Sequence, residues 1–363
     1  MMGTAISVER QEEEQEQVVV GGGGLSATVA VMGCAAMAVF YVAILYAPTL
    51  ILRLPPPASY KSFLIRRFIC AAISSLVSIF ASALILPLRW HAPDVSSAFG
   101  IRFDHLWQAL ILPLSLTSLM YAGSFVQKCL HLLDSWEQHR NYGRNVTIEW
   151  ISKVQDKCID LLLTMPSNIS VWRNYIVAPI TEELVFRACM VPLLLCGGFS
   201  TYTVVFLCPI FFSLAHLNHI LEYYFQKNRS LVKASMAAGF QLGYTVIFGS
   251  YASFLFVRTG HLIAPLVAHI FCNYMGLPTT FSRRAGMVSM VAFIAGSLGF
   301  FWLLFALTEA HAVPVTIDMD ANSCKCFLWH QDSMIQIALI MTNKGHVLNM
   351  QSTLPQGNNK ERR

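Results

Sequence analysis

The sequence predicts an all-α fold: a polytopic membrane helix bundle of about eight transmembrane helices around an intramembrane cavity. The first reason is composition. Of the 363 residues, 55% are hydrophobic and only 12% are charged, whereas soluble domains carry about 25% charged residues. The second reason is the arrangement of the hydrophobic residues. They gather in long stretches, and a helix that crosses a bilayer needs roughly 20 predominantly apolar residues.

About eight stretches have the length, or nearly the length, to cross a bilayer. They are residues 25–51, 64–88, 106–127, 169–196, 200–217, 234–257, 261–278 and 286–308. The fourth is interrupted by charged residues, and the fifth and seventh are short and carry histidine. Interrupted spans are tolerated where they are buried in protein or line a cavity. We therefore expect the functional residues to lie in these interrupted or short stretches.

The ends of the chain differ from this apolar region. Residues 1–24 contain a Glu/Gln run and a run of glycines, and we expect a disordered polar tail there. Residues 25–310 are expected to form one transmembrane domain, with its functional motifs between 179 and 278. Residues 311–363 are a C-terminal tail of mixed composition, and the sequence assigns no role to it.

Lysine and arginine are unevenly spread among the loops. The loops after the odd-numbered stretches hold most of them, including Lys61 and Lys153, whereas those after the even-numbered stretches hold little beyond Arg89, Arg102 and Arg258. By the positive-inside rule the odd-numbered loops are cytosolic. The net charge of +5 is small for this length, and no basic cluster is interleaved with aromatic residues. Nucleic acid is therefore not expected as a partner.

The most informative feature is a charged run in the fourth stretch, which contains Glu182, Glu183 and Arg187. Placing a charged side chain at membrane depth costs at least about 3 kcal/mol, so such residues usually mark a functional site. Glu183 and Arg187 are four residues apart and share a helix face, which predicts an ion pair. Glu182 lies about 100° round the helix and has no equivalent basic partner nearby in the sequence.

An unpaired carboxyl group in an apolar site suits a general base or acid. We therefore assign Glu182 to catalysis, and Glu183 and Arg187 to shaping the site. The alternative is that all three residues form one buried structural network.

His216 closes the short fifth stretch. A lone histidine on an apolar face is more often a hydrogen-bonded core residue than a catalyst. In a protein with intramembrane carboxylates, however, a neutral imidazole can orient and deprotonate water. His219 lies three residues further on, but Asn218 and Glu222 give it ordinary polar partners, so we expect it to be structural. The zinc-protease signature H-E-x-x-H is missing, and neither a metal nor another cofactor is expected.

His269 and Asn273 lie four residues apart in the seventh stretch. Both side chains can donate hydrogen bonds toward one point, which suits stabilisation of a developing oxyanion. Such a donor contributes about 3–4 kcal/mol to catalysis. The alternative is a polar contact between helices, which membrane bundles also use.

Taken in order, the runs EELVFR, FSLAH and HIFCN resemble the type II CAAX prenyl endopeptidases, whose pattern is EExxxR, FxxxH and HxxxN on separate membrane helices. The general layout extends the resemblance over roughly residues 25–308. It implies an intramembrane endopeptidase that removes the last three residues of prenylated CAAX proteins by glutamate-dependent, metal-independent hydrolysis. It also implies that Glu182 and His216 activate the water, and that His269 and Asn273 stabilise the oxyanion.

The resemblance further implies partners and a cellular location. The partners are farnesylated or geranylgeranylated CAAX proteins, such as Ras-like and other small GTPases, together with the lipid bilayer. The place is the endoplasmic reticulum membrane, with the site accessible from the cytosol. Two other readings remain: a binding or maturation factor without protease activity, and a transporter with a proton relay through Glu182 and His216. Transport is disfavoured because the first three stretches contain few polar residues.

Overall fold

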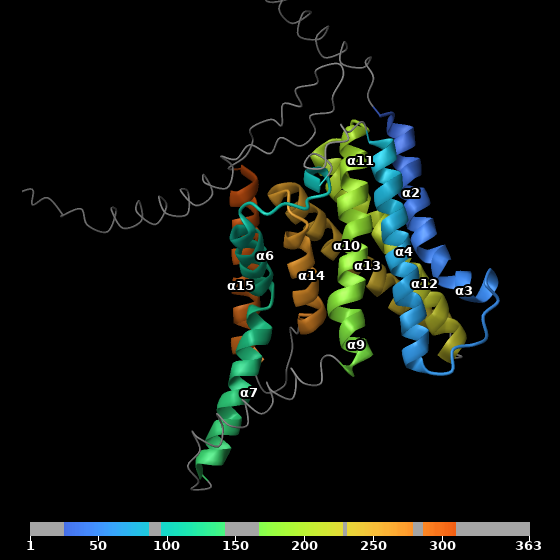
Figure 1. Cartoon of the computed structure of the whole chain (residues 1–363). Coiled ribbons are helices and arrows are strands. Elements are labelled where there is room, and N and C mark those ends of the chain that lie inside the picture. Colours follow the sequence, from blue (N-terminus) through green and yellow to red (C-terminus); the bar gives the residue numbers. More distant parts are fainter. Residues whose placement is uncertain (1–24, 87–95, 142–166, 228–230, 279–285, 310–363) are drawn as a thin grey trace, which may run out of the picture. The chain divides into compact units, whose positions relative to one another are not determined.

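A computed structural model of the chain describes residues 25–86, 96–141, 167–227, 231–278 and 286–309. Within these ranges the chain forms helices joined by turns and contains no β-strand (Figure 1). The predicted all-α class is thereby confirmed. The predicted tails at 1–24 and 311–363 lie outside the described residues, and so does the side chain of His219.

The described helices divide into two compact units. The larger one holds the described residues up to Leu114 and from Asp134 to Leu277, and the smaller one holds the rest. The helices that lie wholly in the larger unit are α2 (Ala27–Ala43), η1 (Ile44–Tyr46), α3 (Ala47–Leu50), α4 (Tyr60–Ile85), α9 (Ile169–Trp172), η3 (Arg173–Val177), α10 (Ala178–Glu183), η4 (Leu184–Cys189), α11 (Met190–Cys196), α12 (Thr201–Lys227), α13 (Leu231–Thr259) and α14 (Ile263–Met275). The smaller unit contains the end of α6 (Leu106–Met120), the first part of α7 (Ala122–Asn141) and α15 (Gly286–Glu309).

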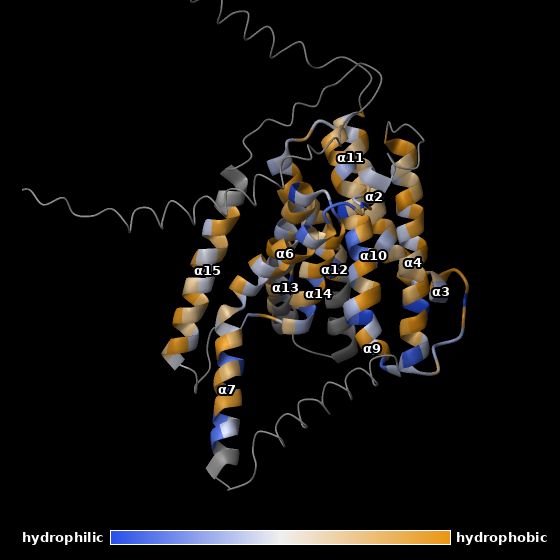
Figure 2. Ribbon diagram, turned by 60° about the vertical axis from the view of Figure 1, so that its left-hand side comes forward, coloured by the Kyte–Doolittle hydropathy of each residue, from blue (hydrophilic) through white to orange (hydrophobic). Residues whose placement is uncertain are grey.

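The helices confirm a polytopic membrane protein. Among the described residues, four helical segments are long and apolar enough to cross a membrane: Ala27–Leu50, Tyr60–Ile85, Gly239–Thr259 and Gly286–Leu304. A fifth is obtained if α6 and α7, which meet at a bend of 73°, count as one broken span. The remaining predicted spans are helical but do not meet this standard. Thr201–Leu217 and Ile263–Met275 are short, and hydrophilic residues interrupt the helical column of α9 and α10 (Figure 2).

Local sequence fixes where several helices begin. The Ser26 hydroxyl accepts a hydrogen bond from the Val29 amide at the start of α2. Ser59 and Ser62 cap each other at the start of α4, each side chain accepting from the other's backbone N–H. Asn168 caps α9 by accepting from the Ser170 amide. Each cap pairs an N–H group that the first helical turn would otherwise leave unpaired.

The core of the larger unit surrounds the column formed by α9, η3, α10, η4 and α11. From Val185 to Leu194 every residue of this column is buried. Two serines of α4 approach it closely. Ser75 Oγ donates to the Ala71 carbonyl of its own helix at 2.9 Å and lies 3.4 Å from the Thr181 carbonyl, and Ser82 donates to the Cys189 carbonyl at 3.1 Å. Small hydroxyl residues at such contacts allow membrane helices to pack closely and to share hydrogen bonds. The charged run therefore lies on the most enclosed helix of this unit.

Helix packing in the smaller unit also depends on small residues. A Cβ added at Gly123 would lie 2.7 Å from the Ser289 carbonyl oxygen, and one at Gly296 would collide with the Leu119 carbonyl. The backbones of α7 and α15, and of α15 and α6, therefore approach at glycines, as is common in membrane bundles.

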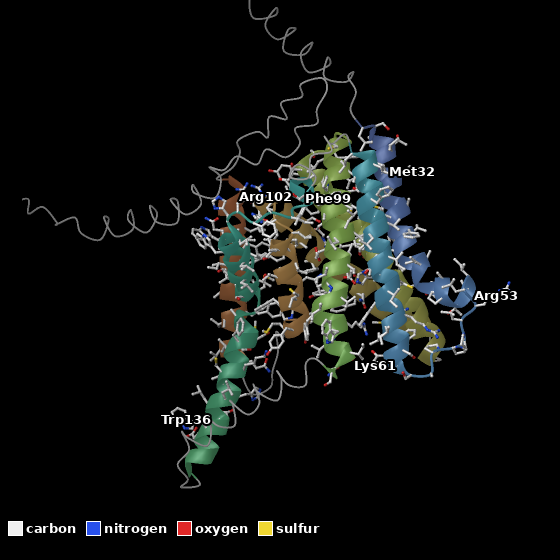
Figure 3. All side chains as sticks on the ribbon, viewed as in Figure 1. Met32, Arg53, Lys61, Phe99, Arg102 and Trp136 are labelled. Carbon is white, nitrogen blue, oxygen red and sulfur yellow. The ribbon has the colours of Figure 1, made fainter. Side chains whose placement is uncertain are left out.

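Labelled side chains show the two ends of the larger unit (Figure 3). Arg53 and Lys61 lie toward the end where α9 begins, whereas Met32, Phe99 and Arg102 lie toward the other end (Figure 3). The sequence pattern places Lys61 in a loop, but it lies in the first turn of α4. The loop just before it is one that the positive-inside rule assigns to the cytosol.

Candidate active site

Glu182 and Glu183 are the last residues of α10, where the helix changes from α to π geometry. A π-helix, η4, follows directly, and another, η3, precedes α10. π-turns inside α-helices occur often at functional sites because they change the direction of side chains and leave backbone groups available. The two carboxylates therefore project from a short α-helical segment between two wider turns.

Glu183 and Arg187 form the predicted ion pair. Arg187 Nη1 donates to Glu183 Oε1 at 3.1 Å, and both side chains are completely buried. Arg187 also donates through Nη2 to the Gly249 carbonyl at 3.4 Å, and its guanidinium lies over the Phe212 ring, 4.5 Å from the centroid. The guanidinium is thus held by α10, α12 and α13 at once.

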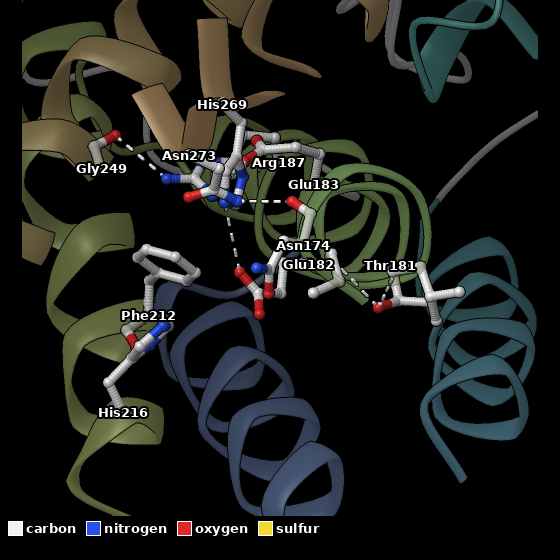
Figure 4. A network of polar contacts seen from close by, with 12 residues as sticks. Asn174, Thr181, Glu182, Glu183, Arg187, Phe212, His216, Gly249, His269 and Asn273 are labelled. Atoms are coloured by element: carbon white, nitrogen blue, oxygen red, sulfur yellow. Dashed lines mark hydrogen bonds and ion pairs between the residues drawn. The ribbon is translucent and has the colours of Figure 1, made fainter. Parts of the chain in front are cut away.

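His269 of α14 lies between the two carboxylates (Figure 4). Its Nδ1 donates to Glu183 Oε1 at 2.7 Å, and its Nε2 lies 3.7 Å from Glu182 Oε2. The sequence offered Glu182 no basic partner nearby, and the fold supplies this ring from a distant helix. Since a carboxylate oxygen can only accept, the contact with Glu183 fixes the Nδ1–H and leaves Nε2 directed toward Glu182.

His216 reaches the site from α12. Its Nδ1 makes a hydrogen bond of 2.9 Å with the Phe212 carbonyl, and its ring packs edge to face on Phe212. A carbonyl oxygen can only accept, so the proton of a neutral His216 lies on Nδ1. The neutral ring then has an unprotonated Nε2, which can accept a hydrogen bond from water.

Asn273 lies one turn beyond His269 on α14 and donates to the Asn174 carbonyl at 2.8 Å. Asn174 belongs to η3, where the Ala178 amide bonds back to the Arg173 carbonyl in the π pattern. By the same pattern the carbonyl of Asn174 would need the N–H of Pro179, and proline has none. Asn273 supplies a donor instead, and a second hydrogen remains on its amide nitrogen.

One cavity of about 720 Å³ joins these side chains. Glu182, His216, His269 and Asn273 all line it, whereas Glu183 and Arg187 are buried behind its wall. Sequence reasoning missed the other lining residues, which include apolar residues of α4, two arginines and a tyrosine: Tyr41, Leu45, Leu64, Arg67, Phe68, Ala71, Arg173, Asn174, Val177, Ala178, Thr181 and Gln241. Only their positions in the fold identify them, because none belongs to a recognisable motif.

Tyr41 supports the wall next to Glu182. Its hydroxyl lies 3.1 Å from Thr181 Oγ1, and Thr181 in turn donates to the Val177 carbonyl at 2.8 Å. A hydrogen-bonded chain from α2 thus runs through Thr181, the residue before the first carboxylate, to the Val177 carbonyl.

Within the described part of the chain, no three His, Cys, Asp or Glu side chains are grouped in a way that could hold a metal ion.

Comparison with known proteins shows which protein family this chain is similar to. A family model described as type II CAAX prenyl endopeptidase Rce1-like matches residues 165–275. The chain is 55% identical over 305 residues to CAAX prenyl protease 2 of Arabidopsis thaliana, covering 84% of this chain and 96% of the relative. It is 34% identical over 257 residues to CAAX prenyl protease 2 of Homo sapiens, covering 70% of this chain and 72% of the relative.

The relative from Caenorhabditis elegans, also called CAAX prenyl protease 2, is 33% identical over 247 residues and covers 66% of this chain and 84% of the relative. No solved structure matches this chain significantly.

Proposed function

Because the chain belongs to the family of type II CAAX prenyl endopeptidases, we propose that it removes the C-terminal tripeptide from prenylated CAAX proteins by means of a water activated by Glu182 and His216. The observation that carries the proposal is the single cavity that Glu182, His216, His269 and Asn273 line together. These residues come from three helices that are far apart in the sequence.

In the first step a water held between Glu182 and His216 attacks the scissile carbonyl carbon. Glu182 takes one proton of the water, and His216 Nε2 orients the water by accepting a hydrogen bond, since its Nδ1 is committed to the Phe212 carbonyl. A carbon–oxygen bond forms, and the carbonyl oxygen becomes an oxyanion. General-base assistance of this kind accelerates a reaction about 10²- to 10⁴-fold.

In the second step the tetrahedral intermediate collapses. Glu182 passes its proton to the nitrogen of the leaving peptide, and the carbon–nitrogen bond breaks. The products are a prenylated cysteine with a free carboxyl group, whose hydroxyl comes from the water, and a tripeptide with a free amine, whose new proton comes from the water through Glu182. Glu182 returns to its starting state.

The oxyanion is stabilised by the remaining N–H of Asn273 and by His269. Glu183 holds the Nδ1–H of His269, so Nε2 is the ring atom that faces the cavity, and it donates when it carries a proton. Preorganised donors of this kind contribute about 3–4 kcal/mol each, because they need no reorientation during the reaction. Glu183 and Arg187 act indirectly, by holding that ring and closing the wall behind it.

The membrane setting suits a lipid-bearing substrate. The cavity wall contains apolar residues such as Leu45, Leu64 and Phe68, so a farnesyl or geranylgeranyl chain can remain in an apolar medium while the peptide reaches Glu182. We place the protein in the endoplasmic reticulum membrane with the cavity accessible from the cytosol, where Ras-like and other small GTPases would reach it. The lysine and arginine distribution supports this orientation.

The test is incubation of membranes that contain the protein with a farnesylated CAAX peptide, and detection of the released tripeptide by mass spectrometry. A peptide with an unmodified cysteine serves as the matched control. We expect release from the farnesylated peptide only. A binding or maturation factor would retain the farnesylated peptide without releasing a tripeptide, and that result would overturn the proposal.

A further inference from the structure

Two arginines line the same cavity as the proposed catalytic residues: Arg67 of α4 and Arg173 of η3. The only acidic residue among the described lining residues is Glu182, so the cavity wall carries more positive than negative charge. Arg67 is half-buried and Arg173 is exposed. The mechanism above uses neither arginine.

A CAAX substrate brings one obligatory negative charge of its own, the carboxylate that ends the chain three residues beyond the prenylated cysteine. We propose that Arg67 and Arg173 bind this terminal carboxylate. This contact would position the peptide bond three residues from the chain end next to Glu182. The inference rests on the proposed function and adds to it the recognition of a free C-terminal acid.

The spacing along the helical column fits this role. Arg173 precedes Glu182 by nine residues (182 − 173) on one continuous helical path. At the α-helical rise of 1.5 Å per residue this corresponds to at most about 13 Å along the axis, because the path begins in the π-helix η3, which rises less per residue. Three extended residues span at most about 10 Å, and the length of an arginine side chain covers the difference. A peptide with its carboxylate at Arg173 therefore has its third-last peptide bond near Glu182.

Arg67 approaches this point from the neighbouring helix, because α4 packs against η3 and α10. Its guanidinium lies over the Phe63 ring, 4.8 Å from the centroid. A guanidinium whose face stacks on an aromatic ring can bind a carboxylate through its in-plane N–H groups, with two parallel hydrogen bonds.

The adjacent arginine provides the contrast. Arg66 Nη1 donates to the Pro55 carbonyl at 2.7 Å, which ties α4 to the loop before it. Arg66 does not belong to the cavity lining. The two neighbouring arginines on α4 therefore differ in function: Arg66 holds the loop and Arg67 faces the cavity.

The experiment compares two farnesylated peptides that are identical except at the end, where one has a free acid and the other an amide. Initial rates of tripeptide release give kcat/KM for each peptide with the wild-type protein, Arg67→Gln, Arg173→Gln and the matched control Arg66→Gln, all in membranes. The ratio of the acid value to the amide value is independent of how much of each variant is folded.

We expect the wild-type protein and Arg66→Gln to prefer the acid by about ten- to a hundredfold, the range of a hydrogen bond to a charged group. In Arg67→Gln and Arg173→Gln this ratio should fall at least severalfold, mainly through KM, and Arg173→Lys should keep part of it. Equal cleavage of both peptides by the wild-type protein, or an unchanged ratio in both cavity variants, would overturn the inference. Cleavage of neither peptide by the wild-type protein would instead contradict the proposed protease function.

Discussion

Glu183 and His269 share a buried hydrogen bond of 2.7 Å that joins helices α10 and α14. The same carboxylate oxygen accepts from Arg187. Glu183 thus neutralises one buried cation and orients one ring of the site. This double role makes it the residue whose replacement should affect both stability and activity.

Replacement of Glu183 by Gln should lower the amount of protein in the membrane and its melting temperature, and should remove activity. The reason is that Arg187 would be left buried without its counter-charge, and breaking such a pair by removing one partner costs about 3–5 kcal/mol. Thermal unfolding in detergent, measured beside peptide cleavage, checks both effects.

A second variant separates the two roles. Glu183→Met combined with Arg187→Met removes both charges, so it should be more stable than Glu183→Gln. It should remain inactive, because Met at position 183 offers the Nδ1–H of His269 no oxygen acceptor. A double variant that is less stable than the single one would contradict this account of the pair.

Asn273→Ala should reduce kcat about 10²- to 10³-fold with little change in KM, since the oxyanion exists only after attack on the carbonyl has begun. The matched control is Asn174→Ala. Asn273 binds the backbone carbonyl of Asn174, which this control retains, and activity should be nearly normal. A purely structural Asn273 would show loss of protein rather than loss of kcat.

Gly249→Ala should destabilise the protein by about 1–3 kcal/mol, the usual cost of overpacking. Its new Cβ would lie 2.9 Å from Pro209 Cβ and 3.3 Å from Arg187 Nη2. Gly239→Ala on the same helix is the control, because a Cβ there meets nothing within 4 Å, and alanine favours the helix by about 1 kcal/mol. Melting temperatures should fall for the first variant and stay level or rise for the second.

Neither Asn145 nor Asn228 should carry a glycan, although both begin an N-x-S/T sequence. Both lie outside the described residues, in loops rich in lysine and arginine that the positive-inside rule keeps in the cytosol. A glycosidase mobility shift on the expressed protein, with each Asn→Gln variant as control, measures this. A glycan on either residue would invert the orientation proposed for the cavity.

The local features of the site follow from the sequence. Glu183 and Arg187 pair because residues four apart share a helix face, and an interrupted apolar stretch can be recognised without a structure. The motif order also singled out Glu182, His216, His269 and Asn273, and all of them line one cavity.

The long-range features do not follow from spacing. His269 lies 86 residues from Glu183, so nothing local predicts that it would be shared by both carboxylates. The pairing of Asn273 with the Asn174 carbonyl depends on a π-turn and on Pro179, whose combined effect appears only once α14 packs against η3. Hydropathy alone could not show that α6 and α7 meet at a bend of 73°.

The central claim is that Glu182 activates the water that cleaves the prenylated peptide. Its most direct test is tripeptide release from a farnesylated CAAX peptide by purified wild-type protein and by Glu182→Gln, at matched protein levels and melting temperatures. Since Glu182 is partly exposed to the cavity and lies 3.7 Å from its nearest ionic partner, His269, the substitution should leave the fold intact. We predict release by the wild-type protein and a loss of at least about 10²-fold in the variant. Near-normal release by Glu182→Gln would contradict the claim.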